Sequence, residues 1–346
     1  MIEIPGDHLE GGGAILRTAT ALSTVTGKPV HIFNIRKSRP NPGLQAQHLE
    51  GLKAVAGLCS ARLEGAKLGS TEVWFHPGKI HAKEISVSIG TAGSIGLLFQ
   101  TLALPASRAS GPVTLKVQGG ATFGKWAPPL PATQSILLPV LQKMGYHAHS
   151  VTERHGFYPA GGARVTIAVQ PRPELKPLIL ENSGKTTHLG GLSVASSHLQ
   201  TAKVAERQAR AAEALLKEKG FSPLIKELYV EAECPGSGLV LWASDGKAIL
   251  GADALGERGK RAEDVGREAG RSLLQAIHSC AGVDAHLSDQ LLLFLACANG
   301  PSRITTPALT RHAETNIWVI QQFLPVTFRT VQEQGRVLIE CSGSPV

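Results

Sequence analysis

The order of helical and strand-like segments recurs along this chain, and the recurrence limits the folds open to it. After a run of three glycines, residues 14–27 have apolar positions at helical spacing and end at a glycine. A strand-like segment follows at 28–35, then a second helical run at 44–59 and a pair of strands ending at the stretch TEVWFHPG. The unit therefore has the order helix, strand, helix, strand, strand, which is typical of an α/β protein.

Two further units show the same order. In the second, helices are expected to begin near Ala92 and Leu130, with the strand VTLKVQ between them and a hairpin that contains residues 154–165. In the third, a helix begins at Asp289 with DQLLLFLACANG, the strand SRITT and the helix ETNIWVIQQFLP follow, and the strands VTFRTV and RVLIECS close the unit. We therefore predict an α/β fold in which three repeated α/β units form one large domain.

A block of residues 183–281 separates the second unit from the third. Its strands LSVAS, KELYVEA and GLVLWAS and its helical runs TAKVAERQARAAEALLKEKG and RAEDVGREAGRSLLQAIHS predict a smaller α/β domain inserted into the large one. The large domain would then consist of residues 1–182, which hold two units, and residues 282–346, which hold the third. A length of 346 residues exceeds what one core usually serves, which agrees with this division.

The composition favours an ordered globular protein inside the cell. Hydrophobic residues make up 42% and charged residues 18%, which argues against a disordered chain, and no apolar run approaches the length of a membrane span. The N-terminus has no basic region followed by an apolar stretch, so we expect no secretion signal and a cytoplasmic location. The five cysteines lack CxxC-type spacing, which favours reduced thiols over a disulfide or zinc framework.

The charge balance is strongly basic. A formal net charge of +8 and a pI near 9.3 indicate a polyanionic partner, because clustered Lys and Arg attract phosphates. A basic surface with no particular partner is the alternative interpretation.

Two stretches near the N-terminus are candidates for phosphate binding. The turn DHLEGGGAILR places glycine N–H groups and a helix N-terminus where a phosphate could bind, with Arg17 one turn inside and Glu10 as a candidate ligand of a divalent cation. The segment IRKSRPNPG presents Arg36, Lys37 and Arg39 on an extended loop, and arginine suits bidentate phosphate recognition. A simple chain reversal, a solvated carboxylate and surface ion pairs are the alternative roles.

Two other stretches combine unusual residues. His312 precedes a helix expected to begin near Glu314, where a side chain can face an anion held at the helix N-terminus. The stretch RHGFYPAGGARV predicts a rigid turn, because Pro159 fixes its own φ while Gly161 and Gly162 supply backbone shapes that other residues resist.

Taken together, these stretches resemble the RNA 3'-terminal phosphate cyclases. RHGFYPAGG is similar to the signature of that family, EGGGAILR to its opening turn, and IRKSRPNPGLQAQHL to its basic loop. HLSDQLLLFLACANG and TRHAETNI resemble its C-terminal nucleotide region, so the resemblance covers nearly the whole chain, including the inserted domain. One departure is Ala163, because the family usually has a third glycine there; a methyl group narrows the available backbone shapes but removes no reactive group.

The resemblance implies a ligase that converts an RNA 3'-phosphate into a 2',3'-cyclic phosphodiester at the expense of ATP. A phosphate monoester oxygen is a poor leaving group, so adenylation supplies AMP as the departing group. In the similar enzymes a histidine attacks the α-phosphate of ATP, AMP passes to the RNA phosphate, and the adjacent 2'-OH closes the ring. The implied cofactors are ATP and a divalent cation, Mg²⁺ or Mn²⁺, and the implied partner is RNA with a 3'-terminal phosphate.

The resemblance also implies roles for individual residues. His312 corresponds to the adenylated nucleophile and Glu10 to the carboxylate of the metal site. The polar active-site positions, which would contact phosphate oxygens of ATP or RNA, are Arg17, Arg36, Arg39 and Gln47. The nucleotide-contacting positions are Gln100, His286, Leu287, Ser288, Asp289 and Gln290. The resemblance places His286 at a position for an aromatic ring that stacks on adenine, and helix capping is the alternative role of Asp289.

Other functions are compatible with parts of this pattern. A non-catalytic, cyclase-like protein acting in ribosome assembly would share the fold but lack the catalytic histidine, so His312 together with Glu10 favours the enzyme. Enolpyruvyl transfer on a similarly repeated scaffold would need a small anionic carbon substrate and is suggested by fold analogy alone. The first long helix of the inserted block either binds RNA or is an amphipathic surface helix, and its pattern favours the second.

Overall fold

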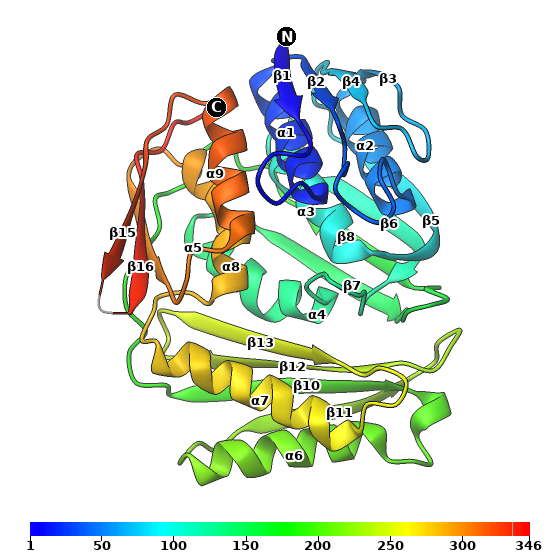
Figure 1. Ribbon diagram of the computed structural model, residues 1–346, viewed down its shortest axis with the longest axis vertical. Coiled ribbons are helices and arrows are strands. Elements are labelled where there is room, and N and C mark those ends of the chain that lie inside the picture. The colour runs from blue at the N-terminus through cyan, green and yellow to red at the C-terminus, as the bar shows by residue number, and fades with distance from the viewer. Residues whose placement is uncertain (334) are drawn as a thin grey trace.

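The computed structural model describes residues 1–333 and 335–346, which form four sheets of four strands each (Figure 1). Three sheets share one strand order, in which the second strand lies between the first and the fourth, and the third strand lies at the edge. In each of the three, the first two strands are parallel and the other neighbours are antiparallel. The α/β class predicted from the sequence is confirmed.

Helices connect the strands within each of these three sheets. The first unit contains β1 (Ile2–Pro5), α1 (Gly13–Thr26), β2 (Val30–Phe33), α2 (Ala46–Cys59), β3 (Arg62–Glu64) and β4 (Val73–His76). The second contains β5 (Glu84–Ser94), α3 (Ile95–Ser107), β6 (Val113–Ala121), α4 (Leu130–Ala132), the π-helical segment η1 (Thr133–Leu137), α5 (Leu138–Lys143), β7 (Ala148–Arg154) and β8 (Arg164–Val169). The third contains β9 (Ile179–Leu180), α8 (Ala285–Ala296), β14 (Ser302–Thr306), α9 (Arg311–Phe323), β15 (Phe328–Glu333) and β16 (Arg336–Cys341).

Each unit begins with a strand that the sequence analysis did not include. β1 has four residues and β9 has two, so neither is long enough for an alternating pattern to be recognised. β5 is longer and ends at Ser94, which overlaps the position near Ala92 where a helix was predicted. Helix α3 begins instead at Ile95, because the Ser94 side chain accepts a hydrogen bond from the backbone N–H of Leu97 at 3.2 Å.

Helix α9 also begins earlier than predicted. Its N-cap is Thr310, whose hydroxyl accepts a hydrogen bond from the backbone N–H of Ala313 at 3.0 Å, so the helix starts at Arg311 and not near Glu314. His312 therefore lies within the first turn of α9, where its backbone position is fixed by the helix.

The start of α8 corrects two predictions. The helix begins at Ala285, and its N-cap is Asp284, whose carboxylate accepts a hydrogen bond from the backbone N–H of Leu287 at 2.8 Å. Asp289, where the helix was predicted to begin, lies in its second turn. The alternative role of Asp289 as a helix cap is therefore wrong.

Helices from the three units pack against one another at the centre of the molecule. α1 contacts both α3 and α9, and α8 contacts α9 (Figure 1). Hydrogen bonds join these helices as well, because the Thr18 hydroxyl of α1 donates to Asn316 Oδ1 of α9 at 2.9 Å. The amide nitrogen of Asn316 in turn donates to the carbonyl of Asp289 in α8 at 3.1 Å.

The fourth sheet is formed by the block between the second and third units. Its strands, in spatial order, are β11 (Leu224–Val230), β10 (His188–Ser196), β12 (Ser237–Ser244) and β13 (Ile249–Leu255). The helices of this block are the short 3-10 helix η2 (Ser197–Leu199), α6 (Val204–Glu218) and α7 (Ala262–His278). Figure 1 shows α6 and α7 on the side of this sheet that faces away from α8 and α9. Strand β13 was not predicted.

The fourth sheet contributes to two cores. Leu239 and Leu241 of β12 pack with α6 and α7 in a core that belongs to this block. Val240 of the same strand and Val194 of β10 belong to the large core that the other three sheets share. The boundaries of the inserted domain, at residues 182/183 and 281/282, stay predictions. None of the helices in the described residues is long and apolar enough to cross a membrane.

Candidate active site

Residues from the first and third units meet at the carboxyl ends of parallel strands. Glu10 lies between β1 and α1, Arg39 lies between β2 and α2, and His312 follows β14. The Arg39 guanidinium forms an ion pair with Glu10 Oε1 and donates a hydrogen bond to the Glu10 carbonyl at 3.2 Å. Glu10 Oε2 lies 3.7 Å from His312 Nδ1. Loops after parallel strands are a common place for ligands in α/β proteins, and here they bring an acid, an arginine and a histidine together.

His312 is held by its helix while its ring remains accessible. The side chain is 51% exposed, and Nδ1 faces Glu10, so Nε2 is on the other edge of the ring. Partial burial lowers the pKa of His312, and the positive charges of Arg17 and Arg39 lower it further. The imidazole is therefore neutral at neutral pH, and one ring nitrogen has a free lone pair.

Glu10 is enclosed by the turn that precedes α1. Its side chain is 11% exposed, and Oε2 has no hydrogen-bond partner among the described residues. The Glu10 backbone N–H donates to the Thr315 hydroxyl of α9 at 3.2 Å, which ties the glycine turn to the helix of His312. A Cβ on Gly12 would lie 2.3 Å from Glu10 Oε2, so a larger residue there would displace the Glu10 carboxylate.

Arg17 lies beside this group, one turn into α1. Gly13 leaves room for it, because a Cβ there would lie 2.4 Å from His48 Nε2 and 3.1 Å from Arg17 Nη1. Burial lowers the pKa of Arg17 to about 10, so the guanidinium is still charged at neutral pH. Burial and the charges of Arg17 and Arg36 lower the pKa of His48 to about 3, so that ring stays neutral.

Arg36 and Gln47 are engaged in the local structure. Arg36 Nη1 donates to the carbonyls of Asn41 at 2.5 Å and Gly43 at 3.0 Å, which closes the basic loop on itself. Gln47 Oε1 accepts a hydrogen bond from the Ser94 backbone N–H at 2.9 Å and so joins the first unit to the second. Of the four predicted polar residues, Arg17 and Arg39 therefore lie beside Glu10 and His312. Arg36 and Gln47 instead form hydrogen bonds with backbone groups of the fold.

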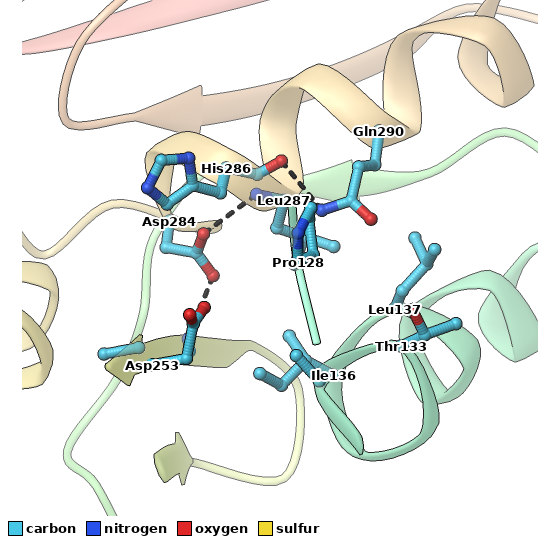
Figure 2. Close-up of a pocket in the computed structure, with 12 residues that line it drawn as sticks. Pro128, Thr133, Ile136, Leu137, Asp253, Asp284, His286, Leu287 and Gln290 are labelled. Carbon is cyan, nitrogen blue, oxygen red and sulfur yellow. Dashed lines mark hydrogen bonds between the residues drawn. The ribbon is translucent and has the colours of Figure 1, made fainter. Parts of the chain in front are cut away.

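A small cavity of about 30 Å³ lies between the N-terminal end of α8, the strand β13 and residues 128–137 (Figure 2). His286 is exposed at this cavity, and Pro128 also lines it. Figure 2 shows two carboxylates on one side, from Asp253 and Asp284. Burial raises the pKa of both, that of Asp253 to about 6. Asp284 also accepts a hydrogen bond from the backbone N–H of Gly251 in β13 at 2.9 Å, so it joins α8 to the fourth sheet.

A second small cavity, of about 40 Å³, connects this region with Arg17. Gln100 and Gln290 line it, and Gln100 Nε2 donates to Gln290 Oε1 at 3.0 Å. Asp289 also lines it, and its carboxylate accepts a hydrogen bond from the Thr310 hydroxyl at 2.5 Å. Burial raises the pKa of Asp289 to about 6. Asp289 therefore joins α8 to the residue that caps the helix of His312.

The other two predicted nucleotide-contacting residues have buried side chains. Leu287 is 2% exposed and lines the cavity of Figure 2. Ser288 is fully buried, and its hydroxyl donates to the carbonyl of Ala285 at 2.7 Å. The hydroxyl of Ser288 is thus committed to its own helix.

Several residues of these cavities were not identified from the sequence. His48 lies in the quoted basic-loop motif, but no spacing indicated that it would be buried against Arg17. The sequence does contain a signal for Asp284. An aspartate directly before an apolar helical run is a typical helix N-cap. Pro128 and Asp253 come from segments that carry no motif, so only the folded chain brings them to α8.

The turn predicted at RHGFYPAGGARV is present between β7 and β8. Gly161 and Gly162 both have a φ of +79°, in the left-handed region that favours glycine. The φ of Ala163 is not positive, so the backbone at this position accommodates a methyl group. The turn borders a groove of about 430 Å³ that Arg154 and Arg164 also line.

The chain is similar to known proteins over nearly its whole length. The family model described as RNA 3'-terminal phosphate cyclase matches residues 8–330. The chain is 44% identical over 342 residues to the RNA 3'-terminal phosphate cyclase of Methanopyrus kandleri, covering 97% of this chain and 96% of that protein. It is 45% identical over 335 residues to the protein of the same name from Thermococcus gammatolerans, covering 96% and 95%. A comparison with the solved structure of the enolpyruvyl transferase NikO from Streptomyces tendae gives a TM-score of only 0.27 at 12% identity, over 97% of this chain and 65% of that one. The chain belongs to the RNA 3'-terminal phosphate cyclase family.

Proposed function

We propose that this protein is an ATP-dependent ligase that converts an RNA 3'-terminal phosphate into a 2',3'-cyclic phosphodiester through a histidine–AMP intermediate. The observation that carries the proposal is the position of His312, whose Nδ1 lies 3.7 Å from Glu10 while its pKa is lowered by burial and by two arginines. A neutral histidine surrounded by cations suits attack on a phosphate, because the lone pair is available and the phosphate charge is stabilised.

Three transfers make up the proposed reaction. His312 Nε2 attacks the α-phosphorus of ATP, and pyrophosphate leaves as the N–P bond forms. An oxygen of the RNA 3'-phosphate then attacks the same phosphorus, the N–P bond breaks, and the imidazole is regenerated. Finally the 2'-OH of the terminal nucleotide loses its proton and attacks its own 3'-phosphate, so that AMP departs and the ring closes. The last step is intramolecular, and effective molarities of about 10⁵ to 10⁸ M are attainable for such steps.

The neighbouring residues support the first transfer. Arg17 and Arg39 carry positive charges beside the ring, which favours phosphate oxygens at this place. The Nδ1 edge of His312 faces the Glu10 carboxylate, so a proton on Nδ1 is favoured and the lone pair is placed on Nε2. The exposed His286 and Pro128 line the small cavity of Figure 2 and offer flat or apolar groups against which an adenine ring would stack.

A divalent cation fits beside Glu10. Its buried Oε2 has no hydrogen-bond partner among the described residues, so the atom is free to act as a ligand. No group of three or more His, Cys, Asp and Glu side chains suited to a metal occurs in the described part of the chain. Phosphate oxygens of ATP would therefore supply further ligands, as is common for Mg²⁺, and the cation would offset charge on the triphosphate.

Labelling with ATP that is radioactive at the α-phosphate, followed by denaturing electrophoresis, tests the proposal. The native protein should retain AMP covalently, while His312→Ala and His312→Asn should retain none, because neither side chain has an available nitrogen lone pair. The adduct should be labile in acid and persist in alkali, as expected for a P–N bond. Capture of AMP by His312→Ala, or an adduct that survives acid, would place the nucleophile elsewhere, with Lys37, Lys125 and His286 the first candidates.

The same experiment separates the enzyme from the alternative role as a non-catalytic protein in ribosome assembly. A scaffold of that kind needs the fold and the basic surface but no reactive histidine. A native, folded protein that captures no AMP in the presence of Mg²⁺ or Mn²⁺ would favour the scaffold.

A further inference from the structure

Three side chains at the edge of the candidate active site form an exposed group that the proposed chemistry does not use. Trp126 is 95% exposed, the highest fraction among the large hydrophobic side chains of the described residues, and Tyr158 is 55% exposed. Lys125 Nζ lies 5.8 Å from the ring centroid of Trp126 and 4.9 Å from that of Tyr158. We call Lys125, Trp126 and Tyr158 the aromatic platform.

Lys125 and Trp126 lie on a loop equivalent to those that carry the candidate catalytic residues, and Tyr158 lies in the turn between β7 and β8. Residues 122–129 follow β6, which is the second parallel strand of its unit. In the first unit the loop after the second strand carries Arg39, and in the third unit the corresponding loop leads to His312. Because the three units share one strand order, the second unit offers Lys125 and Trp126 at the position where its counterparts offer Arg39 and His312.

Direct contacts also connect this loop to the site. A Cβ on Gly124 would lie 3.2 Å from the Cβ of Ser94, whose backbone N–H donates to Gln47. Two residues beyond Trp126, Pro128 lines the cavity of Figure 2. The platform is therefore at the margin of the cavity proposed for the nucleotide.

The loop is constrained although the indole is exposed. Trp126 has a φ of +55°, a region that a bulky residue rarely adopts. Lys125 Nζ lies 3.7 Å from Glu257 Oε1, which belongs to the loop after β13, so the two loops lie side by side. The exposed indole contributes no packing to the fold, and the positive φ of Trp126 costs stability. A residue kept in place at such a cost points to a role in binding.

The chemistry of the platform fits single-stranded RNA. Exposed aromatic rings bind bases by stacking in a way that tolerates any sequence, and a lysine among them attracts the phosphates. Tyr158 belongs to the turn that borders the groove lined by Arg154 and Arg164, so further cations continue from the platform. A protein partner would be expected to bring apolar side chains and acids to a larger apolar surface than two rings offer.

We propose that the aromatic platform stacks on the base that precedes the 3'-terminal nucleotide of the RNA substrate and thereby positions the terminal phosphate. This inference rests on the proposed function, because it takes RNA with a 3'-phosphate as the ligand. It predicts that the protein distinguishes an oligonucleotide from a single nucleotide 3'-phosphate even though the reaction involves one nucleotide only.

Fluorescence anisotropy of a labelled RNA oligonucleotide with a 3'-phosphate, measured without ATP, tests the platform. Trp126→Ala and Tyr158→Ala should each weaken binding about tenfold, the loss expected for one stacked base, while Trp126→Phe should restore most of it. Leu224→Ala is the matched control, because Leu224 is 75% exposed on β11 and should leave binding unchanged. AMP capture by His312 should be the same in all four variants.

A second RNA, with an abasic residue before the terminal nucleotide, decides whether a base is the ligand. The native protein should bind this RNA about as weakly as Trp126→Ala binds the intact RNA, and Trp126→Ala should lose no further affinity. The proposal would be overturned if the native protein and both alanine variants bound the intact RNA with equal affinity. It would also be overturned if the alanine substitutions weakened binding of the intact RNA and of the abasic RNA by the same factor. Since anisotropy needs no ATP, a protein that binds RNA through the platform but captures no AMP would refute the proposed reaction alone.

Discussion

The charge state of His312 depends on its burial and on charged residues that form no hydrogen bond with its ring. Partial burial and the charges of Arg17, Arg39 and His286 all lower its pKa from the ordinary value of 6.5. The protonated ring has no lone pair, so AMP capture should fall as the pH falls through the lowered pKa. We therefore expect the acid limb of the rate of AMP capture to lie below pH 6.5.

Single-turnover labelling across a range of pH measures this limb, and Arg17→Gln supplies the comparison. Removing the positive charge of Arg17 should raise the pKa of His312 and move the acid limb to higher pH, in addition to any loss of rate. A limb that stays at the same pH in Arg17→Gln would show that the charge of Arg17 does not lower the pKa of His312.

The two arginines of the basic loop should behave differently when replaced. Arg39→Ala removes both the ion pair and a hydrogen bond to Glu10, so we expect AMP capture to fall about 10- to 100-fold with little change in thermal unfolding. Arg36→Ala removes two hydrogen bonds to carbonyls of its own loop and should mainly lower stability, by about 1 kcal/mol. Rates and melting temperatures of both variants check this, and equal rate losses would assign Arg36 to the phosphates as well.

At the scale of helices, the N-terminal end of α9 depends on one hydroxyl. Thr310 accepts a hydrogen bond from Ala313 as the N-cap and donates one to Asp289 of α8, so it sets both the start of α9 and its position against α8. Thr310→Ala should lower the free energy of unfolding by about 1 kcal/mol and reduce AMP capture, because His312 lies two residues further on. Thr310→Ser keeps the hydroxyl and should restore both; a loss of stability without a loss of AMP capture would show that the cap does not position His312.

Much of this arrangement could be predicted from the sequence, and the remainder depends on contacts between distant residues. The class of the fold followed from the spacing of apolar residues, and the candidates Glu10, Arg39 and His312 followed from motifs. No local pattern indicates that β9, with two residues, pairs with β14 more than a hundred positions later. The predicted starts of α8 and α9 were also too late. Asp284 and Thr310 act as N-caps because their own backbone is extended, which the sequence around them does not indicate.

At the scale of the whole molecule, the block of residues 183–281 is less independent than its order of elements suggests. Alternate residues of β12 face two cores, since Leu241 packs with α6 and α7 while Val240 packs with the large core. Separation of the block would expose the face that carries Val194 and Val240 to water. The apolar surface on that face therefore couples the block to the rest of the chain.

This coupling predicts a single unfolding transition. Leu241→Ala removes a fully buried side chain from the core under α6 and α7 and should cost about 2 to 5 kcal/mol. If the cores are coupled, calorimetry should show one peak that moves to lower temperature as a whole, with equal calorimetric and van't Hoff enthalpies. AMP capture at His312 should then be lost over the same temperature range as the far-UV circular dichroism, although Leu241 is on the opposite side of the sheet from the large core. An early, separate peak after which His312 still captures AMP would show that the block unfolds by itself, and the shared face would then contribute little to the stability of the site.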